Sequence, residues 1–104
     1  MSAAADEVMA ALAAPTRWRV LNLLAERGEG TATTLAGELP VSRVAVVKHL
    51  AVLDRAGLVH AERIGRETRY RLAPDPLDDA DRWIRETGAA WDARLARLKA
   101  RYER

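Results

Sequence analysis

Positively charged side chains are concentrated in the middle of the chain. Residues 41 to 72 contain seven Lys and Arg against three Asp and Glu, although the net charge of the whole 104-residue chain is only +2. These cations fall into two neighbouring segments: Arg43, Lys48 and Arg55, then Arg63, Arg66, Arg69 and Arg71. A patch of this kind attracts the phosphates of duplex DNA and releases their counterions. The charge pattern therefore indicates an affinity for DNA.

The first cationic segment has the signals of a helix. Ser42 is placed to cap it and Gly57 follows its last turn, so we expect a helix from Arg43 to Ala56. Three apolar residues at spacing i, i+4 and i+7 predict its buried side: Val46, Leu50 and Leu53. The cations then lie on the side that faces solvent.

A shorter helix precedes this one. Thr33 or Thr34 can cap it, and Pro40 ends it, so that only Pro40 and Val41 separate the two helices. Its apolar residues are Leu35, Ala36 and Leu39. Two helices joined by a tight turn are typical of a helix-turn-helix, in which the second helix enters the major groove.

The second cationic segment predicts a β-hairpin. Leu58 to Arg63 and Thr68 to Leu72 are β-compatible runs on either side of the polar turn Ile64 to Glu67. A hairpin directly after the second helix is the place of a wing. The predicted fold class is mainly α with a small β-hairpin, a winged helix-turn-helix.

Further helices are expected on both sides of this unit. Helical spacing predicts one from Ala3 to Ala13, with Ser2 as a possible cap, and one from about Pro15 to Arg27. Beyond Ala73 and Pro74 we expect a single long helix from about Pro76 to Tyr102, roughly 40 Å in length. This is longer than a small domain covers by itself, which favours a homodimer over packing within the monomer.

Apolar residues seven apart along this last helix, together with the first helix, form the expected dimer interface. Its residues are Val8, Leu12, Leu77, Ile84, Gly88, Trp91, Leu95, Leu98 and Tyr102. The whole chain is expected to be one domain, residues 1–104. Residues 15–72 form its DNA-binding core, and residues 1–14 and 76–104 its dimerisation helices.

The expected DNA contacts follow from this arrangement. They are Ser42, Arg43, Val44, Val47, Lys48, His49, Arg63, Arg66 and Arg69. Arg43 could bind guanine O6 and N7, and Val44 or Val47 could meet a thymine methyl group. Ser42 and the helix N-terminus suit a phosphate, and Arg66 suits a phosphate or the minor groove. For a single arginine a solvated face is an equally good explanation, and His49 more often has a structural role.

Other functions find little support in the sequence. The chain has no cysteine, which excludes disulfides and thiolate metal sites, and its two histidines accompany no nucleophile or phosphate loop, so we expect no catalysis. The acidic residues Asp75, Asp78, Asp79 and Asp81 are explained by capping and the helix dipole, so we expect neither metal nor cofactor. Without a long apolar run we expect no membrane contact and a cytoplasmic location.

Residues from about Val8 to Leu72 resemble the ArsR-type transcriptional repressors. The strongest pieces are ALAAPTRWRVLNLL, SRVAVVKHLAVLDRAGLV and GRETRYRL, which stand in the order and spacing of that family. The resemblance implies a dimeric repressor whose first and last helices form the subunit interface. A two-fold dimer would place two recognition helices about one DNA turn apart, so we expect a partly palindromic operator.

Two departures from the family's pattern matter. Val47 stands where many relatives carry serine, so an apolar contact replaces a polar one. The cysteines that bind metal in some sensing members are absent, and the final helix has no histidine, whereas other sensing members pair a His with an Asp there. The chain is similar to members with tryptophans in a long final helix; Trp18, Trp83 and Trp91 could line an effector pocket, but such residues are more often core. No effector follows from the resemblance, and a winged-helix module for protein interaction remains the alternative.

Overall fold

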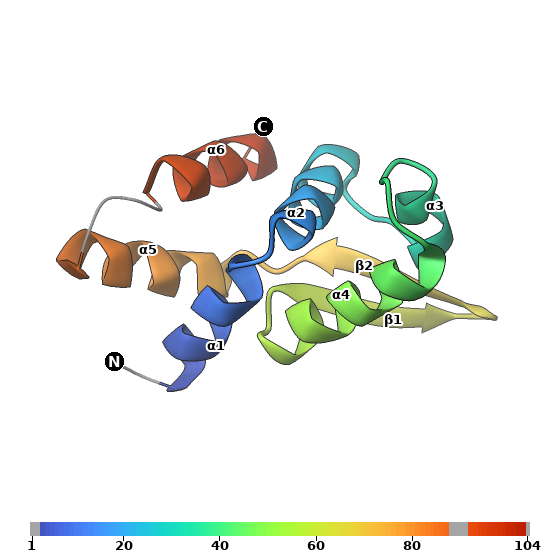
Figure 1. Ribbon diagram of the computed structural model, residues 1–104, viewed down its shortest axis with the longest axis horizontal. Helices are drawn as coiled ribbons and strands as arrows, with labels where there is room; N and C mark the ends of the chain where they lie inside the picture. The colour runs from blue at the N-terminus through green and yellow to red at the C-terminus, as the bar shows by residue number, and fades with distance from the viewer. Residues whose placement is uncertain (1–2, 88–91, 104) are drawn as a thin grey trace.

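The computed structural model describes residues 3–87 and 92–103, and Figure 1 shows the arrangement of their helices and hairpin. In chain order these are α1 (Ala3–Leu12), α2 (Pro15–Arg27), α3 (Ala32–Ala36), α4 (Arg43–Arg55), β1 (Val59–Ile64), β2 (Glu67–Leu72), α5 (Asp75–Thr87) and α6 (Asp92–Tyr102). A helical pair followed by an antiparallel hairpin confirms the predicted winged helix-turn-helix. The proposed cap Ser2 lies outside the described residues.

The first helix of the pair, α3, is capped by Thr31. Its hydroxyl accepts from the Thr34 N–H at 3.1 Å, and the Thr34 hydroxyl accepts from the Thr31 N–H at 2.9 Å. This reciprocal pair satisfies backbone donors that the first helical turn leaves without partners. The prediction of Thr33 or Thr34 as the cap was therefore wrong, because Thr31 is the residue with extended backbone before the first turn.

The connection between the two helices is longer than predicted. α3 ends at Ala36, so Leu39 lies beyond it, and residues 37–42 rather than Pro40 and Val41 alone lead to α4. Ser42 caps α4 as predicted, because its hydroxyl accepts from the Ala45 N–H at 3.1 Å.

The hairpin is regular and is anchored at its base. Its register runs from the pair Val59 and Leu72 to the pair Ile64 and Glu67, so the turn is only Gly65 and Arg66, two residues shorter than predicted. Gly65 has φ +62°, a conformation that glycine adopts without strain. Near the base, Gly30 and Tyr70 exchange two backbone hydrogen bonds, of 3.0 and 2.8 Å. These bonds attach β2 to the segment that joins α2 to α3.

The prediction of one long C-terminal helix was wrong. Lys99 of α6 pairs with Asp78 of α5 at 2.9 Å and with Asp81 at 3.4 Å. In a continuous helix residues 81 and 99 would be about 27 Å apart, so α6 must turn back along α5, as Figure 1 shows. Heptad spacing alone did not reveal this reversal, because Leu77, Leu95 and Leu98 of the same stripe are buried within the single chain, where α6 packs against α2 and α5.

Leu95 tests whether α6 belongs to the core of the single chain. Its side chain is fully buried, at 0% exposure. We expect Leu95→Ala to lower the free energy of unfolding by about 2–5 kcal/mol, through lost transfer energy and the cavity left behind. Chemical denaturation at two protein concentrations measures this.

The matched control is Val44→Ala, at a residue that is 63% exposed; it should change the free energy by less than about 0.5 kcal/mol. A loss for Leu95→Ala that appears only at low protein concentration would place Leu95 in a subunit interface instead.

Candidate nucleic-acid interface

The rotation of α4 about its axis decides which of its side chains face outward. Val46, Leu50 and Leu53 are fully buried, in the same core cluster as Leu21 and Leu24 of α2. Four residues in the first two turns of the helix are left exposed: Arg43, Val44, Val47 and Lys48. The apolar pair among them is substantially accessible, Val44 at 63% and Val47 at 40%. Two cations and two valines therefore share the exposed N-terminal part of α4.

A groove of about 310 Å³ separates α3 and α4 from the hairpin. Arg43 and Val47 line it from α4, and Arg63 and Arg66 line it from the hairpin. Glu67 is the one carboxylate among its lining residues, against three guanidinium groups. The groove is thus positively charged along both walls, and the structure brings together four of the sequence-predicted contact residues.

Neighbouring oxygen atoms hold two of these guanidinium groups in place. Arg43 Nε donates to the Thr33 hydroxyl at 3.2 Å, which joins the first turn of α4 to α3. Arg63 Nε donates to the Gly65 carbonyl at 3.1 Å within the hairpin turn. Thr33 was predicted only as a helix cap; its role in orienting Arg43 was missed, because the signal is a spatial contact between two helices.

The cations of α4 and the hairpin turn lack the ion pairs that several cations on the other helices form among the described residues. Within residues 3–87 and 92–103, Arg43, Lys48, Arg63 and Arg66 form no ion pair with a carboxylate. On the helices behind, by contrast, several cations are neutralised, among them Arg27, Lys99 and Arg101. The charge on the exposed face is therefore available to an external anion.

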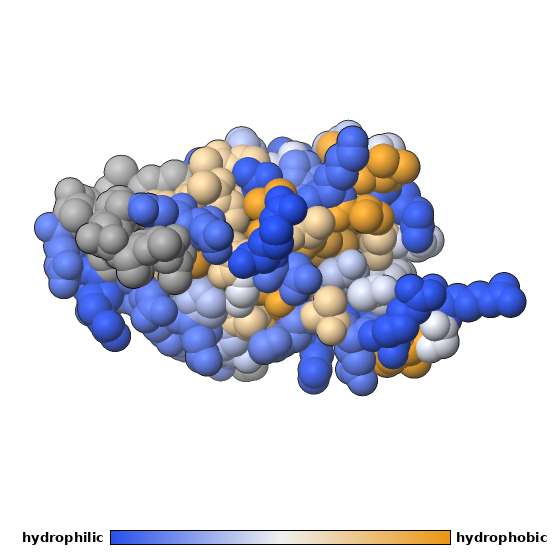
Figure 2. All heavy atoms as spheres, turned by 90° about the horizontal axis from the view of Figure 1, so that it is seen from below, coloured by the Kyte–Doolittle hydropathy of each residue, from blue (hydrophilic) through white to orange (hydrophobic). Residues whose placement is uncertain are grey.

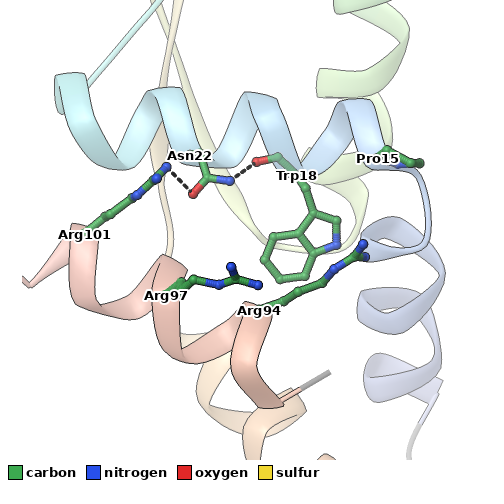
Figure 3. Close-up of a pocket in the computed structure, with 6 residues that line it drawn as sticks. All are labelled: Pro15, Trp18, Asn22, Arg94, Arg97 and Arg101. Atoms are coloured by element: carbon green, nitrogen blue, oxygen red, sulfur yellow. Dashed lines mark hydrogen bonds between the residues drawn. The ribbon is translucent and has the colours of Figure 1, made fainter. Parts of the chain in front are cut away.

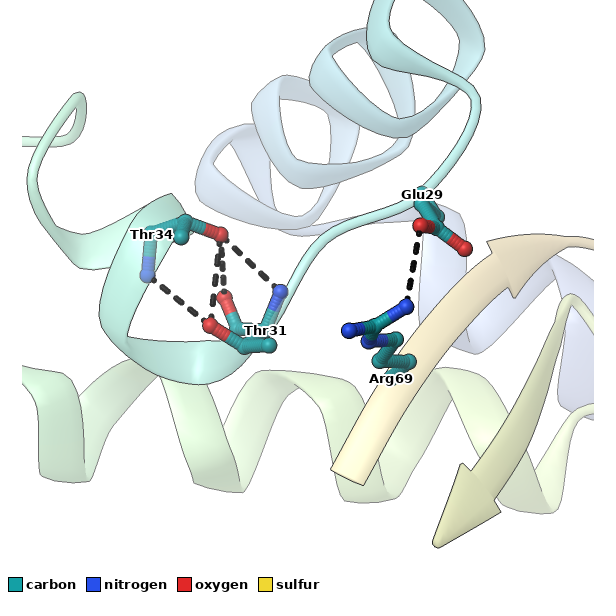
Figure 4. A network of polar contacts seen from close by, with 4 residues as sticks. All are labelled: Glu29, Thr31, Thr34 and Arg69. Atoms are coloured by element: carbon teal, nitrogen blue, oxygen red, sulfur yellow. Dashed lines mark hydrogen bonds and ion pairs between the residues drawn. The ribbon is translucent and has the colours of Figure 1, made fainter. Parts of the chain in front are cut away.

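Arg69 is an exception among the predicted contacts. Its guanidinium lies 3.5 Å from a carboxylate oxygen of Glu29, next to the Thr31 and Thr34 cap (Figure 4). Both side chains are about half exposed, 42% and 52%, and an exposed pair of this kind is worth little energy. Glu29 therefore competes with a phosphate for Arg69.

The molecular surface reflects this distribution. In Figure 2 hydrophilic side chains extend from the end of the molecule where Figure 1 places the hairpin turn, and apolar atoms interrupt the hydrophilic surface beside them. Ile64, 42% exposed, adds apolar surface beside this turn. Such a mixture suits base edges and phosphates better than a uniformly charged surface does.

The side chain of His49 on α4 is half-buried. Burial, and secondly the positive charge of Arg17 on α2, hold the pKa of His49 below its ordinary value. Arg17 is itself fixed, because its Nε donates to the Ala11 carbonyl at 2.6 Å. The imidazole is therefore mainly neutral at pH 7. Its half-buried position favours the structural role over a phosphate contact.

The residues expected at a dimer interface are mostly buried within the single chain. Val8, Leu12, Leu77, Leu95 and Leu98 are at most 2% exposed, whereas Tyr102 is 43% exposed. Gly88 and Trp91 lie outside the described residues, as does the side chain of Ile84. The five buried residues need no second subunit to cover them. The argument from helix length therefore no longer supports a dimer, and the interface remains a prediction.

Two acidic residues in the first half of α5 form ion pairs within the chain. Asp78 and Asp81 pair with Lys99, and Asp81 also pairs with Arg85 at 3.0 Å. Across the described ranges there is no group of three His, Asp or Glu side chains that could hold a metal ion. No helix in the same ranges is long and apolar enough to cross a membrane.

Comparison with known proteins identifies regulators of transcription. Residues 12–62 match the family model of a helix-turn-helix domain. The chain is 43% identical over 74 residues to the HTH-type transcriptional repressor SmtB of Mycobacterium tuberculosis H37Rv, which covers 71% of this chain and 54% of that repressor. The chain thus spans about half the length of this relative. It is also 30% identical over 79 residues to the transcriptional repressor SdpR of Bacillus subtilis 168, covering 76% of this chain and 87% of that protein.

A solved structure extends this similarity to nearly the whole chain. The ArsR-like transcriptional regulator from Rhodococcus sp. RHA1 is 44% identical and superposes with a TM-score of 0.71. The superposition covers 94% of this chain and 92% of that one.

The environment of His49 predicts a measurable titration. Its imidazole should titrate below about 6.5. Between the two pKa values the unfolded chain binds more protons than the folded one, so the free energy of unfolding should fall as the pH drops below about 6.5. NMR of the imidazole signals, assigned with His49→Gln, measures the pKa.

Arg17 provides the control for this titration. Arg17→Gln removes the smaller of the two causes and should raise the pKa, whereas Arg17→Lys keeps the charge and should leave the pKa low. A midpoint above 6.5 in the unmodified protein would contradict the buried placement of His49.

Proposed function

The chain belongs to the ArsR family of helix-turn-helix transcriptional regulators, and we propose that it represses transcription by binding duplex DNA as a homodimer. The observation that carries the proposal is the groove between α4 and the hairpin, whose guanidinium groups are not neutralised by carboxylates of the described chain. SmtB and SdpR are both named as repressors, which supports repression rather than activation.

In this proposal α4 lies in the major groove and reads bases with its first two turns. Arg43, oriented by Thr33, donates to guanine O6 and N7. Val44 and Val47 contact thymine methyl groups, for which their exposed methyl surface is suited. Lys48 binds a neighbouring phosphate, while Ser42 and the N-terminus of α4 bind another.

The hairpin supplies the remaining contacts. Arg66, in the turn, reaches a phosphate or the adjacent minor groove, and Arg63 binds the backbone from the wall of the groove. Arg69 contributes after separating from Glu29. His49, neutral and half-buried, is the weakest member of the set, and any contact it makes is a neutral hydrogen bond rather than a charge interaction.

The homodimer rests on the family resemblance. Each subunit is one domain, residues 1–104, in which residues 15–72 bind DNA and the flanking segments 1–14 and 76–104 carry the subunit contacts. Helices α1 and α5 pack against each other, so we expect a two-fold partner to meet both of them together. A two-fold dimer places two α4 helices on one face and calls for a partly palindromic operator.

Selection of bound sequences from random duplex DNA tests base reading. The unmodified protein should enrich a two-fold-related motif, and native mass measurement of the complex should give two chains per duplex. Arg43→Ala should weaken binding to the selected site by about 1–3 kcal/mol and relax one base pair in each half-site. Equal weakening on all sequences would make Arg43 a phosphate contact. Failure to bind even bulk DNA would favour a protein-interaction module, for which exposed Val44 and Val47 offer surface.

The salt dependence of binding tests the hairpin. Each phosphate contact contributes about −0.9 to the slope of log K against log salt. Arg66→Ala should therefore reduce the slope by about one per subunit, while Arg19→Ala, an exposed cation on α2, should leave it unchanged. An unaltered slope for Arg66→Ala would remove the hairpin turn from the interface.

A further inference from the structure

A second positively charged pocket lies between α2 and α6, at the edge of the core. Its volume is about 230 Å³, and Figure 3 shows its lining: Pro15, Trp18, Asn22, Arg94, Arg97 and Arg101. No carboxylate is among these residues. The site differs from the DNA-facing groove in both position and shape, because it combines guanidinium groups with an indole ring.

The three arginines form one stripe along α6. They are spaced by three and four residues, so they share one side of the helix, and like charges at this spacing destabilise a helix. Arg101 is partly compensated, by Glu26 at 3.0 Å and by the Asn22 side-chain oxygen at 2.9 Å. Arg97 donates only to the Ala93 carbonyl among the hydrogen bonds of the described chain, and it forms no ion pair there. An anion in the pocket would relieve this repulsion.

The other walls of the pocket are formed by Pro15, Trp18 and the side-chain amide of Asn22. Trp18 is 7% exposed, and its ring lies 5.9 Å from the guanidinium carbon of Arg94. Asn22 donates to the Trp18 carbonyl at 2.8 Å, which fixes the amide between the indole and Arg101. A planar ring can pack against exposed Pro15 and the small accessible part of Trp18 while an acid group meets the guanidinium fork of Arg97.

We infer that this pocket binds a small aromatic carboxylate and that its occupancy alters the affinity for DNA. The volume is below the range of about 300–1,000 Å³ typical of drug-sized ligands, so a ligand with a single ring is the appropriate size. The regulatory part rests on the proposed function. It follows from the place of α2, which contacts α6 as well as α4 and β2.

Calorimetric titration of the full chain without DNA tests the site. Benzoate should bind with one molecule per chain, and benzamide, which has the same ring without the charge, should bind at least ten-fold more weakly. Arg97→Gln should weaken benzoate binding at least ten-fold, whereas Arg82→Gln, at an exposed arginine of α5, should not. Absence of benzoate binding, equal binding of benzamide, or an unaffected Arg97→Gln protein would overturn the site. Inorganic phosphate binding as tightly as benzoate would overturn the aromatic part of the assignment.

A separate measurement tests the regulatory part. Saturating benzoate should change the dissociation constant for the selected DNA at least five-fold, and the change should be lost in Arg97→Gln. Benzoate binding with unaltered DNA affinity would overturn regulation while leaving the site in place. A protein that binds benzoate but no DNA would instead overturn the proposed function, so the two failures are distinguishable.

Discussion

Burial of one side of α4 is the constraint on which the rest of the molecule depends. Val46, Leu50 and Leu53 have no exposed surface, so α4 cannot rotate without exposing them or burying Lys48. Burying an unpaired lysine or exposing three aliphatic side chains would cost several kcal/mol. The direction of Arg43 and Val47 toward the hairpin is thus a result of core packing, and base reading makes use of a rotation that the core has already fixed.

Much of the local structure could be predicted from the residues themselves. The limits of α2 and the cap of α4 follow from Pro15, Gly28 and Ser42, whose conformational preferences act over a single turn. The cap of α3 was misplaced because four consecutive residues, from Thr31 to Thr34, include three threonines of similar capping ability. Only the conformation of the preceding backbone distinguishes between them.

The tertiary features were harder to predict. A heptad pattern predicts that a stripe of residues will be buried, but it does not indicate which element will cover the stripe. The reversal between α5 and α6 was therefore not predicted. The residues that establish it, Lys99 with Asp78 and Asp81, looked like an ordinary charged helix surface in the sequence. Among the candidate DNA contacts, exposure of Arg43 and Val47 followed from periodicity. The attachment of Arg69 to Glu29, 40 residues away, could come only from the fold.

The paired hydrogen bonds between Gly30 and Tyr70 divide the hairpin into a fixed base and a projecting end. Beyond Tyr70 the two strands pair with each other, and Arg69 adds only an exposed ion pair with Glu29. The end of the hairpin therefore projects from a base that is attached to the segment between α2 and α3. Bending of this projecting end would let Arg66 follow differences in local DNA curvature without changing the position of α4. Two operators that share the bases contacted by α4 but differ in the flexibility of the flanking DNA could then be bound with α4 in the same position.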